Sequence, residues 1–445
     1  MIQNNFLEKL SKNGNIRVVI GNGFDLFCGL HTTYSNYYCK YWKKYKRIQI
    51  VISEYVSKGI KTNSLNQIIN ECNIWDTFFA IHSSTNPEKC KEKWCEIEKL
   101  ILESLLSERE ISKGVGEDNA PDDQASIYRY IINEQRNKTR TEKEDSLVLK
   151  MRWPELKKCV TGNNKPSNNY EAIMVEFIKC RMKQKGFVAV NYYEFILDEL
   201  KDFEKTFGDF VNEQTTASKY YKSKAEDLLD VLCPLDDDEM SDSYKNVYVD
   251  SFNYTHFHNN FATRNVIVNH INGDYLEPIF GVDSCFEPSD PRFIFTKTSR
   301  RMESKMIYQN YPFEPSLGNV VIFGHSLNEA DYSYYYPIFD KLKMLDNDAK
   351  SVVVFAYNIH DKRKTRTIKS ELRQNVVQMF FNYAKDKQIP NPKRFVDSIS
   401  TQKRIFFFEV DDTIKKRYES FYDPFEENWK EMIKNMKEDL LAGNF

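Results

Sequence analysis

Apolar residues occur in short, nearly continuous runs near the start of the chain and again after residue 245. The first run, IRVVI at residues 16–20, ends at a Gly-Asn-Gly turn. Such runs, rich in β-branched residues and closed by glycine, predict buried strands that lead into turns. Six later runs have the same character, at residues 246–252, 265–271, 278–282, 319–325, 351–357 and 404–410. Strands that are apolar along their whole length are typical of a parallel sheet covered on both faces.

Between these strand-rich parts, residues 46–245 have apolar side chains at three- and four-residue spacings, which predicts amphipathic helices. Within them, residues 113–147 are polar and charge-rich, as mobile segments are. Residues 411–445 have the pattern of a C-terminal helical tail. We therefore expect an α/β fold in which a Rossmann-like parallel sheet flanked by helices is built from residues 14–45 and 246–410 and carries a large helical insertion.

The composition of the chain argues against several classes of partner and site. The 63 basic and 65 acidic residues give a net charge of -2, so we expect neither nucleic acid nor a membrane as a partner. The nine cysteines contain no CxxC pair, which argues against a disulfide scaffold and against a four-cysteine zinc site. Residues 1–15 lack the apolar core of a signal peptide, and no stretch approaches the roughly 20 apolar residues that span a bilayer, so we expect a cytoplasmic protein.

The turn after the first strand is the first candidate binding site. Gly21 and Gly23 flank Asn22, and without a Cβ such a turn allows backbone N–H groups to face a phosphate. The same glycines also suit a tight strand-to-helix turn that serves packing alone, and the turn by itself does not decide between the two. The dinucleotide fingerprint of dehydrogenases needs a third glycine where this chain has Leu26, so a nicotinamide-dependent dehydrogenase is disfavoured.

Two later strands end in polar residues, at the edge where a parallel sheet binds its ligands. Asn253 and Thr255 follow the strand at 246–252. The Asn253 amide could hold a ribose hydroxyl or orient a water, although a strand-end asparagine also commonly caps a turn. His270 and Asn272 follow the next strand, where His270 is either a general base or a structural histidine.

A second glycine turn follows the strand at 319–325. Gly324 ends this strand, and Ser326 stands where a helix N-cap belongs. Two such turns in one sheet favour nucleotide binding over packing alone. His256 and His258 have a spacing that a strand could turn toward one metal ion, but no third ligand lies near them in the sequence, so we expect no metal.

The chain carries four segments in a fixed order: IGNGFDLFCGLHTTY, DSFNYTH, VNHING with the following IFGVDS, and VVIFGHSLNEADYSYY. Together they resemble the motifs of the AbiH family of phage abortive-infection proteins. AbiH proteins in turn resemble a distant, zinc-free branch of the sirtuin-like NAD-binding fold. The resemblance implies a role in phage defence, with NAD or a related small-molecule nucleotide as ligand or substrate. A phage-derived activator and self-association into a homo-oligomer are further partner hypotheses.

The sirtuin-like resemblance also implies roles for individual residues. The glycine loop would lie against the NAD pyrophosphate, the Gly324 turn against the adenosine ribose, and Asn358 near the adenine. The nucleotide-binding set is then Gly21, Asn22, Gly23, Phe24, Thr255, Asn272, Gly324, Ser326 and Asn358. In the catalytic set, Asn253 would position the ribose or a water while His270 or Asp25 takes a proton.

One departure from the sirtuin-like pattern bears on catalysis. Position 272 is Asn where those enzymes have a catalytic histidine, and an amide cannot act as a general base at neutral pH. His270 lies two residues upstream, roughly 6.6 Å back along the strand. Three hypotheses follow: an NAD glycohydrolase effector, a non-catalytic nucleotide sensor, or a scaffold whose helical insertion binds a phage protein or nucleic acid. A zinc-dependent deacetylase is not expected, because its four cysteines are absent.

Overall fold

The structure of the chain is a computed structural model. It describes residues 15–58, 63–82, 97–107, 110, 151–234, 246–256, 260–261, 264–282, 286–304, 317–327, 331–359, 365–419 and 423–442. The chain divides into two compact units. The first, here called the sheet unit, comprises Met1–Thr32, Gly208–Pro278 and Ser304–Asn428; the second, the helical unit, comprises Thr33–Phe207, Ile279–Glu303 and Trp429–Phe445.

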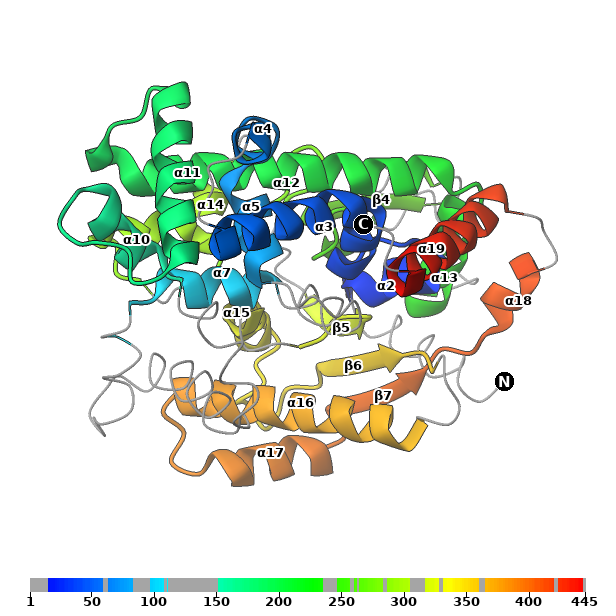
Figure 1. Cartoon of the computed structure of the whole chain (residues 1–445). Helices are drawn as coiled ribbons and strands as arrows, with labels where there is room; N and C mark the ends of the chain where they lie inside the picture. Colours follow the sequence, from blue (N-terminus) through cyan, green and yellow to red (C-terminus); the bar gives the residue numbers. More distant parts are fainter. Residues whose placement is uncertain are drawn as a thin grey trace. The chain divides into compact units, whose positions relative to one another are not determined.

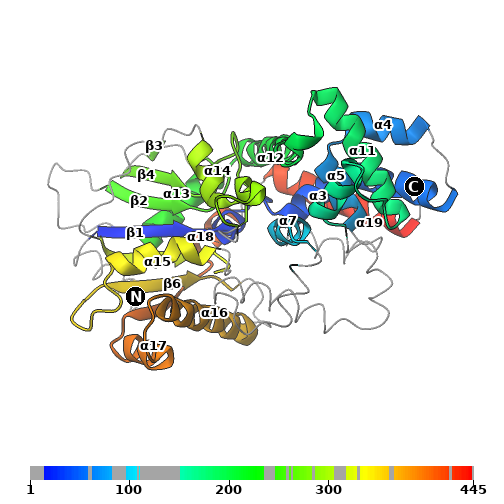
Figure 2. The same ribbon diagram turned by 90° about the vertical axis from the view of Figure 1, so that its left-hand side faces the viewer.

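The sheet unit is built around one sheet (Figures 1 and 2). Its strands are β1 (Asn15–Ile20), β2 (Asn246–Ser251), β3 (Asn260–Phe261), β4 (Arg264–His270), β5 (Leu317–Phe323), β6 (Val352–Tyr357) and β7 (Ile405–Glu409). They lie in the order β3-β4-β2-β1-β5-β6-β7, and every neighbouring pair is parallel except β3 with β4. Without the two-residue β3, this is the doubly wound order 3-2-1-4-5-6. The predicted Rossmann-like fold is therefore confirmed.

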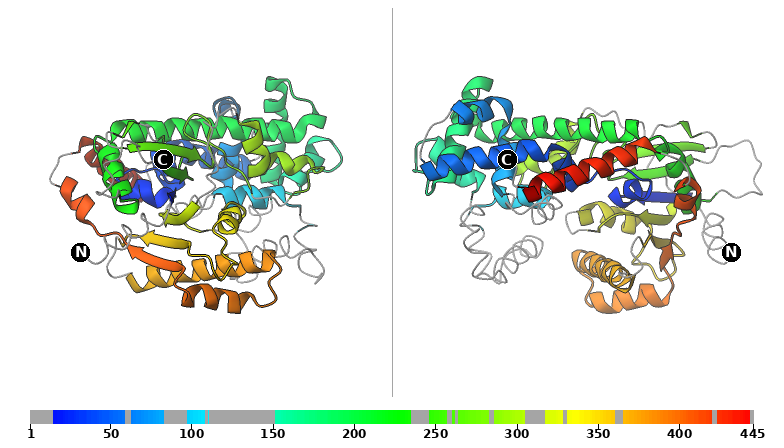
Figure 3. Two further views of the ribbon diagram at one scale, coloured as in Figure 1. Left: turned by 180° about the vertical axis from the view of Figure 1, so that it is seen from behind. Right: turned by 45° about the vertical axis from the view of Figure 1, so that its right-hand side comes forward.

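Helices cover both faces of this sheet. Side chains of β1 alternate between them: Val18 and Ile20 pack on one face and Val19 on the other. The first face is covered by α2 (Asn22–Phe27), α13 (Tyr221–Leu232) and α18 (Thr413–Glu419). The second is covered by α15 (Tyr332–Lys341), α16 (Thr365–Asp386) and α17 (Pro392–Thr401), of which α16 and α17 lie side by side in Figure 3. Cover on both faces explains why the strands are apolar at nearly every position.

The helical unit is held together by an aromatic core. Its elements are α3 (Tyr34–Lys58), α4 (Asn63–Glu71), α5 (Ile74–His82), α7 (Ile97–Leu105), α10 (Trp153–Val160), α11 (Asn169–Lys185), η2 (Ala189–Asn191), most of α12 (Tyr192–Ala217), η3 (Pro291–Phe295), α14 (Lys297–Glu303) and most of α19 (Pro424–Ala442). Trp153 lies 4.9 Å, between ring centroids, from both Trp75 and Phe78. No described helix is both long and apolar enough to cross a bilayer.

The strand expected at residues 278–282 was wrong. The Phe280 N–H donates to Glu204 Oε1 at 2.7 Å, and Val282 makes only an isolated bridge with Thr296. Ile279 and Phe280 are buried, so the apolar run fills the core of the helical unit instead of adding a strand. An apolar run of five residues shows that a segment is buried, but it does not distinguish a strand from buried irregular chain.

The unit boundaries differ from the ranges inferred from sequence. Residues 33–45, which the pattern placed with the sheet, belong to the helical unit. Helix α13, which the pattern placed in the insertion, packs on the sheet through Leu228, Leu229 and Leu232. An amphipathic stripe reveals that a helix has a buried face but not what covers it. Residues 113–147 lie outside the described residues.

Candidate functional site

The parallel strands bring the sequence-derived candidates to one edge of the sheet. Gly21 follows β1, Asn253 follows β2, His270 ends β4, Gly324 follows β5 and Asn358 follows β6. Because these strands run in the same direction, their carboxyl ends lie at a common edge. The strand order reverses between β1 and β5, and such a reversal is where doubly wound sheets bind their ligands.

Asp25, on α2, is the centre of a buried polar cluster at this edge. Its side chain is inaccessible, with 1% of the residue exposed. The Tyr221 hydroxyl donates to Oδ1 at 2.8 Å, and the Thr255 hydroxyl lies 3.2 Å from Oδ1 and 3.0 Å from Oδ2. Thr32 Oγ1 lies 3.4 Å from Oδ2 and donates to Asn22 Oδ1 at 3.0 Å. The first glycine turn, α13 and the segment after β2 thus meet at one carboxyl group.

The environment of Asp25 makes it titrate near neutrality. Burial, the largest effect, raises its pKa to about 7, against the opposing hydrogen bonds of Tyr221, Thr255 and Thr32 and the nearby Asn253 amide. Burial also raises the pKa of Tyr221 well above its ordinary value, so that hydroxyl keeps its proton and remains a donor. Strongly shifted carboxyl groups at a ligand-binding edge are characteristic of functional sites. Near pH 7 this group exists in both charge states.

Asn253 lies next to Asp25, and its side-chain amide finds no hydrogen-bond partner among the described residues. The residue is 4% exposed, and its backbone N–H donates to Ser251 Oγ at 3.1 Å, which fixes the turn after β2. The amide is close enough to Asp25 to favour the ionised carboxyl. Even so, neither Oδ1 nor Nδ2 makes a hydrogen bond of standard geometry to the described residues. Leaving a buried amide unsatisfied costs roughly 1–3 kcal/mol, which makes this amide a candidate contact for a bound ligand or water.

The two glycine turns pack against each other across the point where strand order reverses. The Gly21 N–H donates to the Phe323 carbonyl at 3.0 Å, and the Gly23 N–H donates to the Gly324 carbonyl at 2.8 Å. A Cβ on Gly23 would lie 2.6 Å from the Gly324 Cα, and Gly324 itself has φ of 69°. Close backbone contact therefore accounts for these glycines, and a phosphate at this turn would have to displace the Gly23 bond. The proposed phosphate contact remains a prediction.

Two other nucleotide-binding candidates have structural partners. Phe24 is fully buried and packs edge-on against Phe323, with ring centroids 6.3 Å apart. Asn358 Nδ2 donates to the Val410 carbonyl at 2.8 Å, and its Oδ1 accepts from Lys415 Nζ at 2.8 Å. The Asn358 amide therefore ties the end of β6 to the segment after β7.

Ser326 was wrongly expected to be a helix N-cap. The N-cap residue of α15 is Asp331, and Ser326 is exposed. In this turn His325 is the organising side chain, because its Nδ1 accepts the Leu327 N–H at 3.0 Å and its Nε2 lies 3.4 Å from Asp331 Oδ2. Leu327 has φ of 55°, and its side chain is buried, which turns the backbone sharply and leaves Ser326 at the surface.

The end of β4 holds two further candidates. Asn272 is buried beside Gly273, which has φ of 77°. His270 is partly exposed, yet its Nδ1 is buried and lacks a hydrogen-bond partner among the described residues. Burial lowers the pKa of His270 to about 4, although Asp274 and the Asn253 backbone oppose that shift. At neutral pH the ring is uncharged and a weak base.

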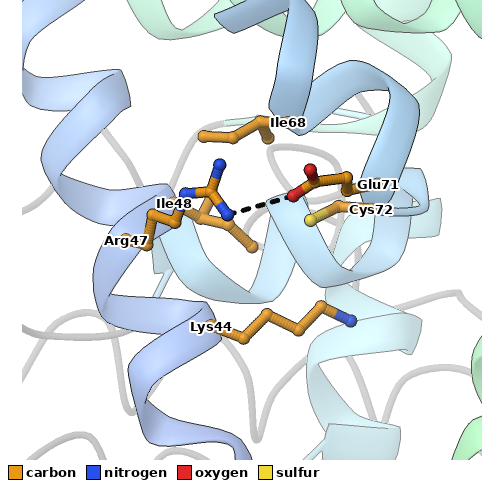
Figure 4. A pocket seen from close by; sticks show the side chains of 6 residues that line it. All are labelled: Lys44, Arg47, Ile48, Ile68, Glu71 and Cys72. Carbon is orange, nitrogen blue, oxygen red and sulfur yellow. Dashed lines mark hydrogen bonds and ion pairs between the residues drawn. The ribbon is translucent and has the colours of Figure 1, made fainter. Parts of the chain in front are cut away.

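A small cavity among the described residues of the helical unit is too small for a nucleotide, and its cations are already paired (Figure 4). Its volume is about 160 Å³, and its lining residues are Lys44, Arg47, Ile48, Ile68, Glu71 and Cys72. Typical ligand pockets measure ~300–1,000 Å³. Arg47 pairs with Glu71 at 3.0 Å and Lys44 with Asp76 at 2.6 Å, so the cations are already neutralised.

A second cluster in the helical unit gathers the carboxylates of Asp198, Glu199 and Asp202 within 4.8 Å of one another. Lys185 Nζ lies 2.6 Å, 2.8 Å and 2.5 Å from these three groups, so an ammonium already takes the place of a cation. Of the pair His256 and His258, whose spacing was considered for a metal, His258 lies outside the described residues.

Sequence reasoning missed Tyr221 and Thr32. Tyr221 lies in the region of helical pattern, 196 residues from Asp25, and nothing local to it signals a polar role. Thr32 stands in the first motif, but its neighbours gave no reason to single it out. Thr255 was predicted to contact a nucleotide, and in the structure it contacts Asp25.

Comparison with known proteins gives one match. The family model described as Bacteriophage abortive infection AbiH matches residues 18–357, which is well over half of the chain. The matched range contains the Asp25 cluster, Asn253, His270 and both glycine turns, and it ends one residue before Asn358. Searches of curated proteins and of solved structures find no match to the chain.

Proposed function

The chain belongs to the AbiH family of bacteriophage abortive infection proteins, and from this premise we propose that it binds NAD or a related adenine nucleotide and cleaves it. Family membership implies a role in abortive infection. The nucleotide would lie at the carboxyl edge of the sheet, with its nicotinamide ribose over Asn253 and Asp25. The observation that carries the proposal is the unsatisfied, buried Asn253 amide beside a carboxyl group whose pKa is raised to about 7.

The reaction that fits these groups is hydrolysis of the nicotinamide–ribose bond. The C1′–N bond breaks and its electron pair leaves with nicotinamide, while a water oxygen bonds to C1′ and the water gives up a proton. Cleavage passes through an oxocarbenium-like state, which a nearby carboxylate stabilises. Ionised Asp25 would supply that negative charge, and the Asn253 amide would orient a ribose hydroxyl through its donor and acceptor atoms.

Asp25 suits an electrostatic role for two reasons. It is shielded from water, so its charge acts through a low dielectric and is worth more than it would be at the surface. Its hydroxyl partners, Tyr221 and Thr255, fix the carboxyl group before substrate arrives, which avoids reorganisation during the reaction. Because the charge is present only above about pH 7, turnover should increase as pH rises through that value.

A direct test is to incubate the purified chain with NAD, alone and with extract from phage-infected cells, and to measure nicotinamide release. Asp25→Asn and Asn253→Ala should each lower the release by about 10²-fold or more. Asp76→Asn is the matched control, since Asp76 is also a buried carboxyl bonded by a tyrosine, Tyr45 at 2.9 Å, but lies in the helical unit. Absence of nicotinamide release under both conditions would sink the cleavage proposal.

A nucleotide sensor without catalysis is the second candidate, and two observations favour it. Asn272 stands where the sirtuin-like resemblance implies a catalytic histidine. The Gly23–Gly324 contact closes the reversal point, so a ligand entering there must part the two turns and change the local conformation. Calorimetry separates the candidates: NAD binding without nicotinamide release supports the sensor, and no binding of any adenine nucleotide rejects both.

A further inference from the structure

His256 and Asp274 form an ordered pair at the same edge of the sheet. His256 follows β2 three residues after Asn253, and its Nδ1 lies 3.2 Å from Asp274 Oδ2. The His256 ring stacks on His270, with centroids 5.6 Å apart and an interplanar angle of 9°, and meets Tyr275 edge-on at 6.1 Å. The His256 side chain is 40% exposed, whereas that of Asp274 is 2% exposed. The pair therefore combines an accessible imidazole with a buried carboxylate.

Asp274 is held so that it fixes the His256 ring. Its Oδ1 accepts the Leu276 N–H at 2.8 Å and the Glu277 N–H at 3.4 Å, which leaves Oδ2 directed at the imidazole. Burial alone would raise the pKa of Asp274, but the hydrogen bonds from His256 and Leu276 hold it below its ordinary value. Asp274 is therefore an anion at neutral pH. When the neutral ring carries its proton on Nδ1, facing that anion, the basic lone pair is on Nε2.

The other candidate bases at this edge are poorly suited to take a proton from water. Asp25 is 1% exposed, and both of its oxygens contact hydroxyl groups of the chain itself. His270 has a pKa lowered to about 4, so its affinity for a proton at neutral pH is low. His256 stacks on His270 and follows Asn253 by three residues, so it belongs to the same strand-end segment as the Asn253 amide.

We propose that His256, oriented by Asp274, is the general base of this site. The inference rests on the proposed function, in which water attacks C1′ of the nicotinamide ribose. As the water oxygen bonds to C1′, its proton passes to His256 Nε2, while the electrons of the C1′–N bond leave with nicotinamide. Asp274 stabilises the resulting imidazolium and is a positioning residue. His256 then returns the proton to solvent, to which it is exposed.

The experiment measures kcat and KM for NAD cleavage by the full chain and four variants. His256→Ala should lower kcat by ~10²–10⁴-fold and leave KM within about threefold, because a general base acts in the transition state and not in binding. Added imidazole should restore at least about a tenth of the lost rate by entering the vacated position. Asp274→Asn should lower kcat by about 10²-fold or more without rescue by imidazole, since the displaced ring is still present. In Asp274→Asn the new amide could itself donate a hydrogen bond to His256 Nδ1. Asp274→Ala removes the side chain altogether and so shows whether the loss of rate comes from that new contact.

The matched control is His31→Ala, which removes another partly exposed histidine with a carboxylate partner, Glu426 at 3.5 Å, and should keep the wild-type kcat. Wild-type turnover together with an active His256→Ala variant overturns the assignment and leaves the proposed function standing. Loss of kcat in His256→Ala accompanied by a weakened NAD affinity and no imidazole rescue also overturns it, as a structural role would give that result. A wild-type chain that neither binds nor cleaves NAD overturns the proposed function and the assignment together.

Discussion

Replacing Asp25 with asparagine should stabilise the sheet unit at alkaline pH while lowering the proposed NAD turnover. Asparagine has the same shape as aspartate and no charge. The surrounding hydroxyls of Tyr221, Thr255 and Thr32 can each donate or accept, so they can rotate to suit an amide. The substitution therefore removes a buried charge and keeps its hydrogen-bond partners.

The magnitude follows from the pKa of Asp25, which is raised from 3.8 in a free carboxyl to about 7 in the fold. A raised pKa means that the folded state binds the proton more tightly than the unfolded state. Its stabilising contribution is thus fully present below pH 3.8 and is lost as pH rises to about 7. The difference of roughly 3 pKa units corresponds to ~4 kcal/mol. Asp25→Asn should match wild type near pH 4 and exceed its free energy of unfolding by up to ~4 kcal/mol at pH 8.

The assay has to report on the sheet unit by itself. The described tryptophans Trp42, Trp75, Trp153 and Trp429 all belong to the helical unit, so their fluorescence is not the right probe. Hydrogen exchange of the peptide covering residues 15–30, measured with increasing urea at several pH values, gives the free energy of opening around β1 and α2. When the free energies of opening of wild type and Asp25→Asn are compared at the same pH, the contributions of all other titrating groups cancel.

Asp76→Asn supplies the contrast. Asp76 pairs with Lys44 at 2.6 Å and with the Tyr45 hydroxyl at 2.9 Å, so its loss leaves a cation without its partner and destabilises the helical unit by about 1.5–3 kcal/mol. If Asp25→Asn is likewise destabilised, by the same amount at pH 4 and at pH 8, the reasoning on the Asp25 pKa is refuted.

Three further outcomes are expected. Gly23→Ala should lower the free energy of unfolding by more than about 2 kcal/mol, because the added methyl would lie 2.6 Å from the Gly324 Cα, and an unchanged melting temperature would contradict that contact. His270 has its pKa lowered from 6.5 to about 4, so its stabilising contribution is present above pH 6.5 and falls by ~3 kcal/mol as pH drops to 4; His270→Gln should lose this pH dependence in urea titrations. Arg404→Ala should cost about 3 kcal/mol in calorimetry, since the buried Arg404 guanidinium donates to the carbonyls of Leu342 and Asp346 beyond α15, and a loss below 1 kcal/mol would mean that water replaces it.

Local sequence patterns predicted most of the strands correctly, but one apolar run was wrongly predicted to be a strand. The runs at residues 16–20, 246–252 and 319–325 fall on β1, β2 and β5, because apolar, β-branched runs closed by glycine or polar residues favour strands. The run at 278–282 has the same composition and is buried irregular chain, with Phe280 bonded to Glu204. Composition reports burial, and a partner strand is needed to make a buried segment a strand.

The sequence by itself determined that a parallel α/β sheet forms, that Asn253 and Asp25 are polar candidates near its strand ends, and which family's motifs the chain carries. Only the tertiary structure decided the strand order, which places β1 beside β5, and brought Tyr221 to Asp25 from 196 residues away. The tertiary structure also decided the pKa of Asp25. A carboxyl group titrates near 4 in water, and its pKa moves to about 7 only when distant segments exclude solvent around it, a property that no local pattern contains.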